Sequence, residues 1–294
     1  IWSPKTATKA PIMLWLFGGG GVVGAGSLPT YDGTAFARDG VILVTINYRL
    51  GGLGGFAHPA LTREKNGGPN ANYALLDAIA ALRWVKENAE AFGGDPRNIT
   101  LFGESAGATM TANLVTSPIA KGLFSKAIIE STGSLPTPAT PLAKAEAIGA
   151  KVASDLGLPG ADATSAQLRA LDAGRFLEHK IGGFGFRTIS DGVVQPGSIM
   201  DAFEQRAQND VMLMLGTNSD EGRLAGTQRV AALAEKRRPV FHYFFDYVPS
   251  ALRSEHPNGA PHAGELPFVF DTLDSYAPTE DARPTEEDRA VARL

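Results

Sequence analysis

Apolar residues in this chain gather in short continuous runs, which alternate with longer stretches where they recur every three or four positions. The clearest runs cover residues 11–17, 41–48 and 211–215. Such runs are typical of strands buried on both faces of a parallel sheet. More mixed segments complete the predicted strands, at residues 98–102, 125–130 and 240–246. Strands that alternate with helices, without hairpin turns, predict a parallel α/β sheet.

The helical periodicity is clearest between residues 70 and 92, where five apolar positions share one face: Leu75, Ile79, Leu82, Val85 and Ala89. The Gly-Gly-Asp-Pro that follows is expected to end this helix. Further helices are predicted at residues 106–115, 142–156 and 165–179. We interpret the chain as one domain over residues 1–294, with a mainly helical insertion at 132–187. Residues 278–294 are interpreted as an incomplete C-terminal helical segment, because Thr285 to Asp288 resembles a capping box.

Ser105 lies between a predicted strand and a predicted helix, in the sequence Gly-Glu-Ser-Ala-Gly. A serine on such a turn is directed outward, and glycines two positions before and after leave room for the strained backbone. The pentapeptide alone could be a glycine-lined turn with a solvated serine. The strand before it and the helix after it indicate a nucleophile elbow.

A serine hydroxyl needs a base to remove its proton and an acid to orient that base. Asp220 and Glu221 both follow the predicted strand at 211–215, and the residues alone do not distinguish them. His256 and His262 both follow the last predicted strand, and they are likewise left open as the base. The other histidines precede the serine or lie within predicted elements: His58, His179 and His242. A metal site of His256, His262 and Glu265 matches no standard ligand spacing.

Four consecutive glycines, Gly18 to Gly21, follow the first predicted strand. Successive glycines let backbone N–H groups point inward together, as an oxyanion hole requires, and the N–H of Ala106 can add another donor. Residues 19–24 also match the Gly-x-Gly-x-x-Gly dinucleotide fingerprint. That fingerprint must open a helix and be followed by an acidic residue after the next strand, and this sequence meets neither requirement. The Rossmann interpretation is therefore rejected.

Composition limits the remaining function classes. The chain contains no cysteine, which excludes disulfides, thiolate metal sites and a cysteine nucleophile. A net charge of −4 with scattered Lys and Arg argues against a nucleic-acid surface. No apolar run reaches the length of a membrane span. No signal peptide is recognised and the first residue is Ile1, so localisation stays open, with a secreted or periplasmic site favoured over a cytoplasmic one.

Several segments together resemble the type-B carboxylesterases, the family that includes the cholinesterases and bacterial para-nitrobenzyl esterases. The matching segments are Thr-Ile-Asn-Tyr-Arg-Leu-Gly (45–51), Asn-Tyr-Ala-Leu-Leu-Asp (72–77), Ala-Leu-Arg-Trp-Val (81–85), Phe-Gly-Gly-Asp-Pro (92–96), Phe-Gly-Glu-Ser-Ala-Gly (102–107), Gly-Thr-Asn-Ser-Asp-Glu-Gly (216–222) and His-Ala-Gly-Glu-Leu-Pro-Phe-Val-Phe (262–270). The resemblance implies an α/β-hydrolase fold. It also implies hydrolysis of small to medium carboxylic esters without a metal or organic cofactor.

The resemblance also assigns roles that the residues alone leave open. It implies Ser105 as nucleophile, Glu221 rather than Asp220 as acid, and His262 rather than His256 as base. It implies Gly19, Gly20 and Ala106 as the oxyanion hole and Ser131 as a supporting residue near the triad. Further candidates for substrate contact are Glu104, Gly21, Phe184 and Phe186. A charged Glu104 would favour a cationic or neutral group over an anionic one.

The chain also departs from the family pattern. It lacks the N-terminal strands, much of the helical segment between acid and histidine, and the C-terminal helices of the family fold. Phe17 and Gly21 differ from the common His-Gly-Gly-Gly-Phe motif, and Gly21 in place of an aromatic would loosen the acyl pocket. The alternative function is a catalytically inactive, cholinesterase-like binding or adhesion module. The sequence leaves the oligomeric state and the natural ester open.

Overall fold

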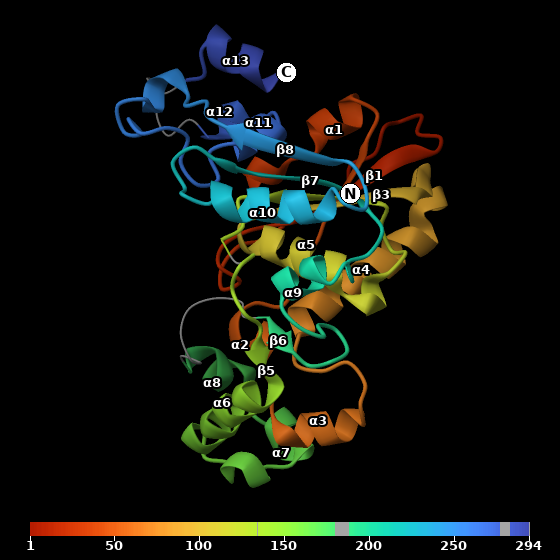
Figure 1. Ribbon diagram of the computed structural model, residues 1–294, viewed down its shortest axis with the longest axis vertical. Helices are drawn as coiled ribbons and strands as arrows, with labels where there is room; N and C mark the ends of the chain where they lie inside the picture. Colours follow the sequence, from red (N-terminus) through yellow and green to blue (C-terminus); the bar gives the residue numbers. More distant parts are fainter. Residues whose placement is uncertain (134, 180–187, 277–282, 294) are drawn as a thin grey trace.

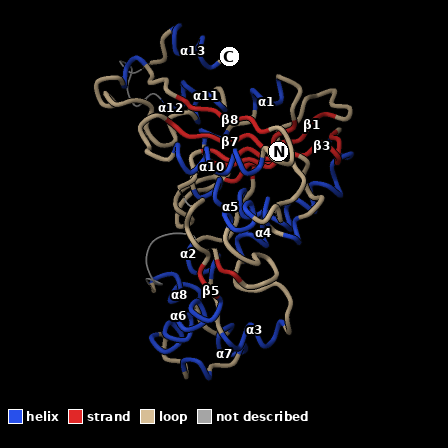
Figure 2. Tube along the Cα trace, in the orientation of Figure 1, coloured by secondary structure: helices blue, strands red, loops and turns tan. Residues whose placement is uncertain are grey.

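The computed structural model describes residues 1–133, 135–179, 188–276 and 283–293. At its centre lies a six-stranded sheet, whose strands are all parallel and follow the order β2-β1-β3-β4-β7-β8 (Figures 1 and 2). The strands are β1 Ala10–Leu16, β2 Ile42–Thr45, β3 Gly94–Glu104, β4 Lys126–Glu130, β7 Met212–Asn218 and β8 Val240–Phe245. Each strand predicted from the apolar pattern is present, so the parallel α/β architecture is confirmed.

Two strands are longer than the sequence predicts, and both extensions matter for the site. β3 begins at Gly94, which pairs with Ala10 before the main register of β1 and β3. β7 continues through Asn218, which pairs with Phe245 of β8. The carboxyl ends of β3, β4 and β7 therefore lie side by side at one edge of the sheet.

Helices cover both faces of the sheet (Figure 1). On one side lie α4 Tyr73–Asn88, α5 Ala106–Thr116, α9 Ile199–Glu204 and α10 Leu224–Ala234. On the other side lie α1 Thr34–Arg38 and α11 Leu266–Val269, followed by α12 Leu273–Tyr276 and α13 Glu286–Ala292. Short 3-10 turns connect several elements: η1 Pro29–Tyr31, η2 Ala89–Phe92, η3 Pro118–Ala120, η4 Gly160–Asp162 and η5 Ser250–Leu252.

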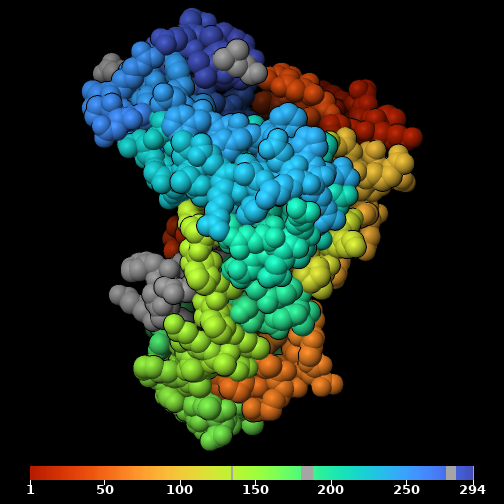
Figure 3. Space-filling view, in the orientation of Figure 1, coloured from red at the N-terminus to blue at the C-terminus, as the bar shows by residue number. Residues whose placement is uncertain are grey.

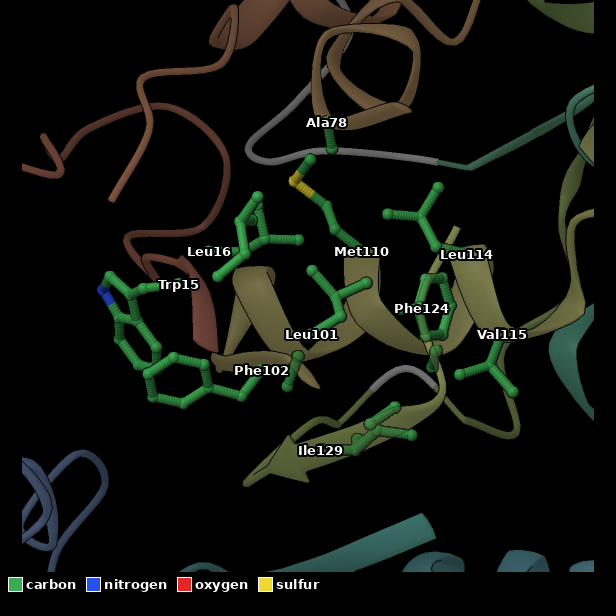
Figure 4. Close-up of a cluster of buried hydrophobic side chains, with 14 of the residues drawn as sticks. Trp15, Leu16, Ala78, Leu101, Phe102, Met110, Leu114, Val115, Phe124 and Ile129 are labelled. Atoms are coloured by element: carbon green, nitrogen blue, oxygen red, sulfur yellow. The ribbon is translucent and has the colours of Figure 1, made fainter. Parts of the chain in front are cut away.

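The hydrophobic core is continuous through the sheet. On one face the Trp15 and Phe102 rings lie with centroids 4.7 Å apart. On the other face, Leu101 points toward the side of α5 that carries Met110 (Figure 4). Full burial of a large apolar side chain contributes about 1.5–3 kcal/mol. The strands that lead to the site are therefore anchored from both sides.

A smaller, mainly helical lobe extends below the sheet (Figures 1 and 3). It contains α2 Gly51–Gly55, α3 Pro59–Lys65, α6 Leu142–Asp155, α7 Ser165–Arg169 and α8 Ala173–Glu178, with the two short strands β5 Thr140–Pro141 and β6 Ile189–Ser190. The Asn72 amide joins this lobe to α4, donating to the Ile189 carbonyl at 2.8 Å and accepting from the Ile189 N–H at 3.0 Å. Within the predicted insertion at 132–187, Arg169 donates to Glu64 at 2.6 and 2.7 Å, and the Gly160 carbonyl lies 3.0 Å from His58 Nε2, so its described part packs against α3 and the residue before it.

The prediction of one helix over residues 165–179 is wrong. The structure has two short helices, α7 and α8, separated at residues 170–172. The Asp172 carboxylate accepts a hydrogen bond from the Arg175 N–H at 3.2 Å and so starts α8 anew. An aspartate that caps a helix competes with continuation of the preceding one.

The expected capping box near the end of the chain is confirmed. The Thr285 hydroxyl accepts from the Asp288 N–H, and the Asp288 carboxylate accepts from the Thr285 N–H at 2.7 Å. Both contacts satisfy backbone donors that have no partner within the helix. This segment therefore begins α13 as the sequence predicts.

The turn between β3 and α5, which carries the predicted nucleophile, has a strained backbone. Ser105 has φ 55° and ψ −116°, values that a residue with a side chain rarely adopts. A Cβ atom built on Gly103 would lie 2.6 Å from the Leu16 carbonyl oxygen, and one on Gly107 would lie 1.8 Å from it. The two glycines are therefore required because α5 passes so close to β1.

We expect Gly107→Ala to destabilise the fold, because the added methyl group would push α5 away from β1. The expected loss in the free energy of unfolding is about 3 kcal/mol, measured by urea denaturation. Gly55→Ala is the matched control, since a Cβ there meets nothing within 4 Å. Equal denaturation midpoints for the two variants would contradict the steric argument.

Candidate active site

Ser105 lies at the carboxyl edge of the sheet, where β3 ends and α5 begins. Its backbone N–H donates to the Glu130 carbonyl at the end of β4, at 2.9 Å. Its side chain thus projects beyond the strand ends, where other loops can reach it. In parallel α/β sheets this edge is the usual place for ligand binding.

His262 approaches Ser105 from the long loop after β8. Its Nε2 atom lies 2.8 Å from the Ser105 hydroxyl oxygen, and its Nδ1 atom lies 2.5 Å from Glu221 Oε1. The structure therefore brings Ser105, His262 and Glu221 into one hydrogen-bonded chain. His256 is not part of this hydrogen-bonded chain. Within the described residues, the hydrogen bonds of His256 involve only its backbone atoms.

Glu221 follows β7 and is held by the residues that end this strand. The Thr217 hydroxyl donates a short hydrogen bond to Glu221 Oε2, and the Asn218 N–H donates to the same oxygen at 3.2 Å. Burial alone would raise the pKa of Glu221, but the hydrogen bonds from His262 and Thr217 outweigh it and lower that pKa. The carboxylate is therefore charged at neutral pH, and it can orient the imidazole.

The hydrogen bond to Glu221 raises the pKa of His262 above its ordinary value of 6.5, although partial burial opposes this shift. The imidazolium is thus favoured, and the neutral ring becomes dominant only at a pH above that raised value. Only the neutral ring can accept a proton from Ser105.

Glu104, the residue before Ser105, is buried rather than solvated, with 3% of its surface exposed. Its Oε1 atom lies 3.0 Å from His262 Nε2. Burial raises the pKa of Glu104 to about 8, and the nearby Glu265 and Glu221 carboxylates add to this shift. The expected preference against anionic groups depended on a charged Glu104, and its largely neutral state near pH 7 removes that basis.

Ser131 lies behind the hydrogen-bonded chain, in the turn after β4. It is fully buried, has φ 56°, and its N–H donates to the Gly216 carbonyl at 3.0 Å. Its hydroxyl lies 3.4 Å from Glu265 Oε1, and Asn218 donates to the other oxygen of Glu265 at 2.5 Å. Glu265 thus links the turn after β4 to the end of β7.

Two ionisable groups near these hydrogen-bonded residues were given no such place from the sequence: Glu265, which was considered only as a metal ligand, and Arg223. Glu265 stands three residues after His262, within a segment that matches the family pattern, and this spacing was the available signal. Arg223 stands two residues after Glu221 and matches no motif. Its Nη1 atom donates to the Ser131 carbonyl and lies 3.4 Å from His262 Nδ1. No pattern in the sequence indicates this contact.

The glycine loop after β1 leaves its N–H groups available. Gly19, Gly20 and Gly21 have φ values of 98°, 65° and 72°, which favour glycine. The Gly19 carbonyl accepts hydrogen bonds from the two residues after Gly21, which closes the turn. Among the described residues, the N–H groups of Gly19, Gly20 and Ala106 donate to no protein acceptor. Phe184 and Phe186, which were predicted as candidates for substrate contact, lie outside the described residues.

The comparisons with known proteins identify the family. A sequence model described as "Carboxylesterase family" matches residues 1–228. This chain belongs to the carboxylesterase family. It is 43% identical to fumonisin B1 esterase of Sphingopyxis macrogoltabida, over 93% of this chain and 60% of that protein. It is 34% identical to para-nitrobenzyl esterase of Bacillus subtilis (strain 168), over 98% of this chain and 69% of that protein.

Solved carboxylesterases share the fold. A thermophilic para-nitrobenzyl esterase superposes with a TM-score of 0.78 at 31% identity, covering 98% of this chain and 70% of that one. A carboxylesterase of Geobacillus stearothermophilus gives a TM-score of 0.78 at 29% identity, covering 98% and 72%. The α/β-hydrolase fold expected from the motifs is therefore confirmed. The chain spans about 60% of the length of the fumonisin B1 esterase that it matches.

Two further findings concern only the described part of the chain. It contains no helix that is both long and apolar enough to cross a bilayer. It also contains no group of three or more His, Cys, Asp or Glu residues arranged to hold a metal ion.

We expect Glu221→Gln to lower the pKa of His262, because the amide removes the charge that stabilises the imidazolium. The pKa can be followed by NMR titration of the imidazole ring, and it should fall toward or below 6.5. Asp220→Asn is the matched control and should leave the titration unchanged. A shift in the Asp220 variant alone would identify Asp220 as the orienting acid.

Proposed function

We propose that this carboxylesterase-family chain hydrolyses small to medium carboxylic esters through an acyl-enzyme. The supporting observation is the continuous hydrogen-bonded chain from Ser105 through His262 to Glu221, at 2.8 Å and 2.5 Å. The two named relatives, fumonisin B1 esterase and para-nitrobenzyl esterase, are esterases by name and support the same reaction class. Nothing in the described residues favours the inactive binding module over an enzyme.

In the first half of the reaction, the Ser105 oxygen attacks the ester carbonyl carbon. The Ser105 proton passes to His262 Nε2, and the negative charge of Glu221 stabilises the imidazolium that forms. The bond to the alcohol oxygen then breaks, and His262 returns its proton to that leaving group. The products of this half are a free alcohol and an acyl group bound to Ser105.

In the second half, water takes the place of the alcohol. His262 accepts a proton from the water while its oxygen attacks the acyl carbon, and the tetrahedral intermediate collapses to release the carboxylic acid. The proton returns to the Ser105 oxygen, which restores the free enzyme. His262 therefore acts twice as a base and twice as an acid, and water is the only co-substrate.

We assign the oxyanion hole to the N–H groups of Gly19, Gly20 and Ala106. These donors are free of protein acceptors within the described residues, so an oxyanion would not displace an existing hydrogen bond. Ala106 is also the first residue of α5, whose N-terminus favours negative charge. Loss of one such donor typically costs about 3–4 kcal/mol of transition-state stabilisation.

The proposed substrate contacts follow from the same geometry. Gly21 follows the proposed oxyanion donors Gly19 and Gly20 in the same loop. Because it has no side chain, it would leave the pocket open beside the acyl group. Glu104 faces the reacting atoms through His262 and, being largely neutral near pH 7, would tolerate an acyl group of either charge. Ser131 is proposed to support Glu221 from behind and not to contact substrate.

Ser105→Ala should abolish esterase activity, because no other described serine lies on the elbow or contacts His262. The expected loss in kcat is on the order of 10⁵–10⁶-fold with a p-nitrophenyl ester. A fluorophosphonate should label the original chain at Ser105, as identified by peptide mass spectrometry. Ser154→Ala, on α6 in the smaller lobe, is the control and should keep both activity and labelling. Retained turnover in the Ser105 variant, with labelling elsewhere, would refute the assignment.

Exhaustive chelation should leave the hydrolysis rate unchanged, because the nucleophile, base and oxyanion donors are all supplied by the chain. The measurement compares initial rates before and after dialysis against a strong chelator. Loss of turnover that a divalent cation restores would contradict the proposed mechanism.

A further inference from the structure

Arg223 connects three loops of the site that lie far apart in the sequence. It stands two residues after Glu221, at the start of α10, and its Nη1 atom donates to the Ser131 carbonyl after β4. The same nitrogen lies 3.4 Å from Nδ1 of His262, in the loop after β8. The guanidinium therefore spans the turn behind the triad and the edge of the imidazole.

The contact between Arg223 and His262 is not an ordinary hydrogen bond. For Nε2 to accept the Ser105 proton, the neutral ring must carry its own proton on Nδ1, and that proton points to Glu221 at 2.5 Å. Nδ1 then has no lone pair for Arg223. What remains at this distance is a permanent positive charge beside a ring that becomes positive when it is protonated.

The charge of Arg223 is not neutralised by a close partner. Within the described residues, no carboxylate lies within 4 Å of its guanidinium, although several other arginines form such pairs. A guanidinium keeps its charge over the whole working pH range. Its effect on the imidazole is therefore constant while the neighbouring acids titrate.

The other charged groups that face His262 come from three segments. Glu221 follows β7 and is charged at neutral pH. Glu104 at the end of β3 has a pKa of about 8, and burial also raises the pKa of Glu265 in the histidine loop. The hydrogen bond to Glu221 and the neighbouring Glu104 raise the pKa of His262, whereas partial burial and the charge of Arg223 lower it. Arg223 is therefore the charged side chain that opposes the imidazolium among these groups.

We propose that Arg223 is a positioning residue that acts through His262: its fixed charge, 3.4 Å from Nδ1 of the ring, keeps the imidazole in its neutral, proton-accepting form down to lower pH. This inference rests on the proposed function of the site. Glu221 is needed to orient the ring and to stabilise the imidazolium during turnover. Without a counter-charge, the same carboxylate would leave the resting enzyme protonated over more of the neutral range.

The size of the effect follows from distance and exposure. His262 is 39% exposed on its side chain, so water screens the interaction. A unit charge a few ångström away, in a dielectric near that of water, displaces a pKa by about half to one unit. A shift of this size is measurable in a pH–rate profile.

The test compares pH profiles of kcat/KM for the original chain, Arg223→Met and Arg223→Lys. In the Met variant the acidic limb should move up by about half to one pH unit, with little change in KM for a neutral ester. Lysine keeps the charge and should retain most of the original limb. Arg229→Met removes the same charge from an exposed pair with Glu204 on α10 and α9, and should change nothing. An unmoved limb in the Met variant would overturn the proposal.

A second readout does not depend on esterase activity. The His262 ring can be titrated by NMR in a Ser105→Ala background, with and without Arg223→Met, after melting curves have shown that both proteins are folded. We expect the same upward shift in the double variant. If the shift appears but Ser105→Ala keeps its activity, the proposed function fails and the role of Arg223 stands. If Ser105 is essential but the ring does not shift, only the role assigned to Arg223 fails.

Discussion

The close approach of α5 to β1 is the constraint on which the site depends. Gly107 allows the helix to pass against the Leu16 carbonyl, and Gly103 allows the strand to turn without colliding with it. This contact places Ser105 in its strained conformation, with its side chain beyond the ends of the strands. It also puts the N-terminus of α5 beside the glycine loop that leaves β1. The proposed nucleophile and the proposed oxyanion donors thus share one steric origin.

Around this turn, the site is organised by a balance of charges rather than by one ion pair. Glu221 is the carboxylate that stays charged, because its hydrogen bonds with His262 and Thr217 lower its pKa. Glu104 and Glu265 are buried, and burial raises the pKa of both. The cost of desolvating a carboxylate explains why neighbouring acids can have opposite protonation states at the same pH. The proposed catalytic geometry therefore includes two buried carboxyl groups whose pKa is raised.

Much of the fold was predictable from the sequence because apolar runs report burial on both faces of a strand. The elbow was also predictable, because the glycines two positions before and after Ser105 indicate that the backbone there has no room for side chains. The break between α7 and α8 was missed, since Asp172 can either continue a helix or cap a new one. The burial of Glu104 and the contact of Arg223 with His262 were missed for another reason. Both depend on loops that meet only in three dimensions, and no local pattern records such a meeting.

The site residues are far apart along the chain, and this separation affects how the proposed esterase activity is acquired during folding. Ser105 and His262 are 157 positions apart, and the chain between them includes β4, β7 and β8. Closing such a long loop costs chain entropy that is recovered only when the intervening strands have paired. The elbow forms from neighbouring segments, whereas His262, the proposed base, reaches it only through a contact across 157 positions. Recovery of the proposed esterase activity during refolding therefore requires the last strand and its loop to dock, whereas helical content depends on more local contacts.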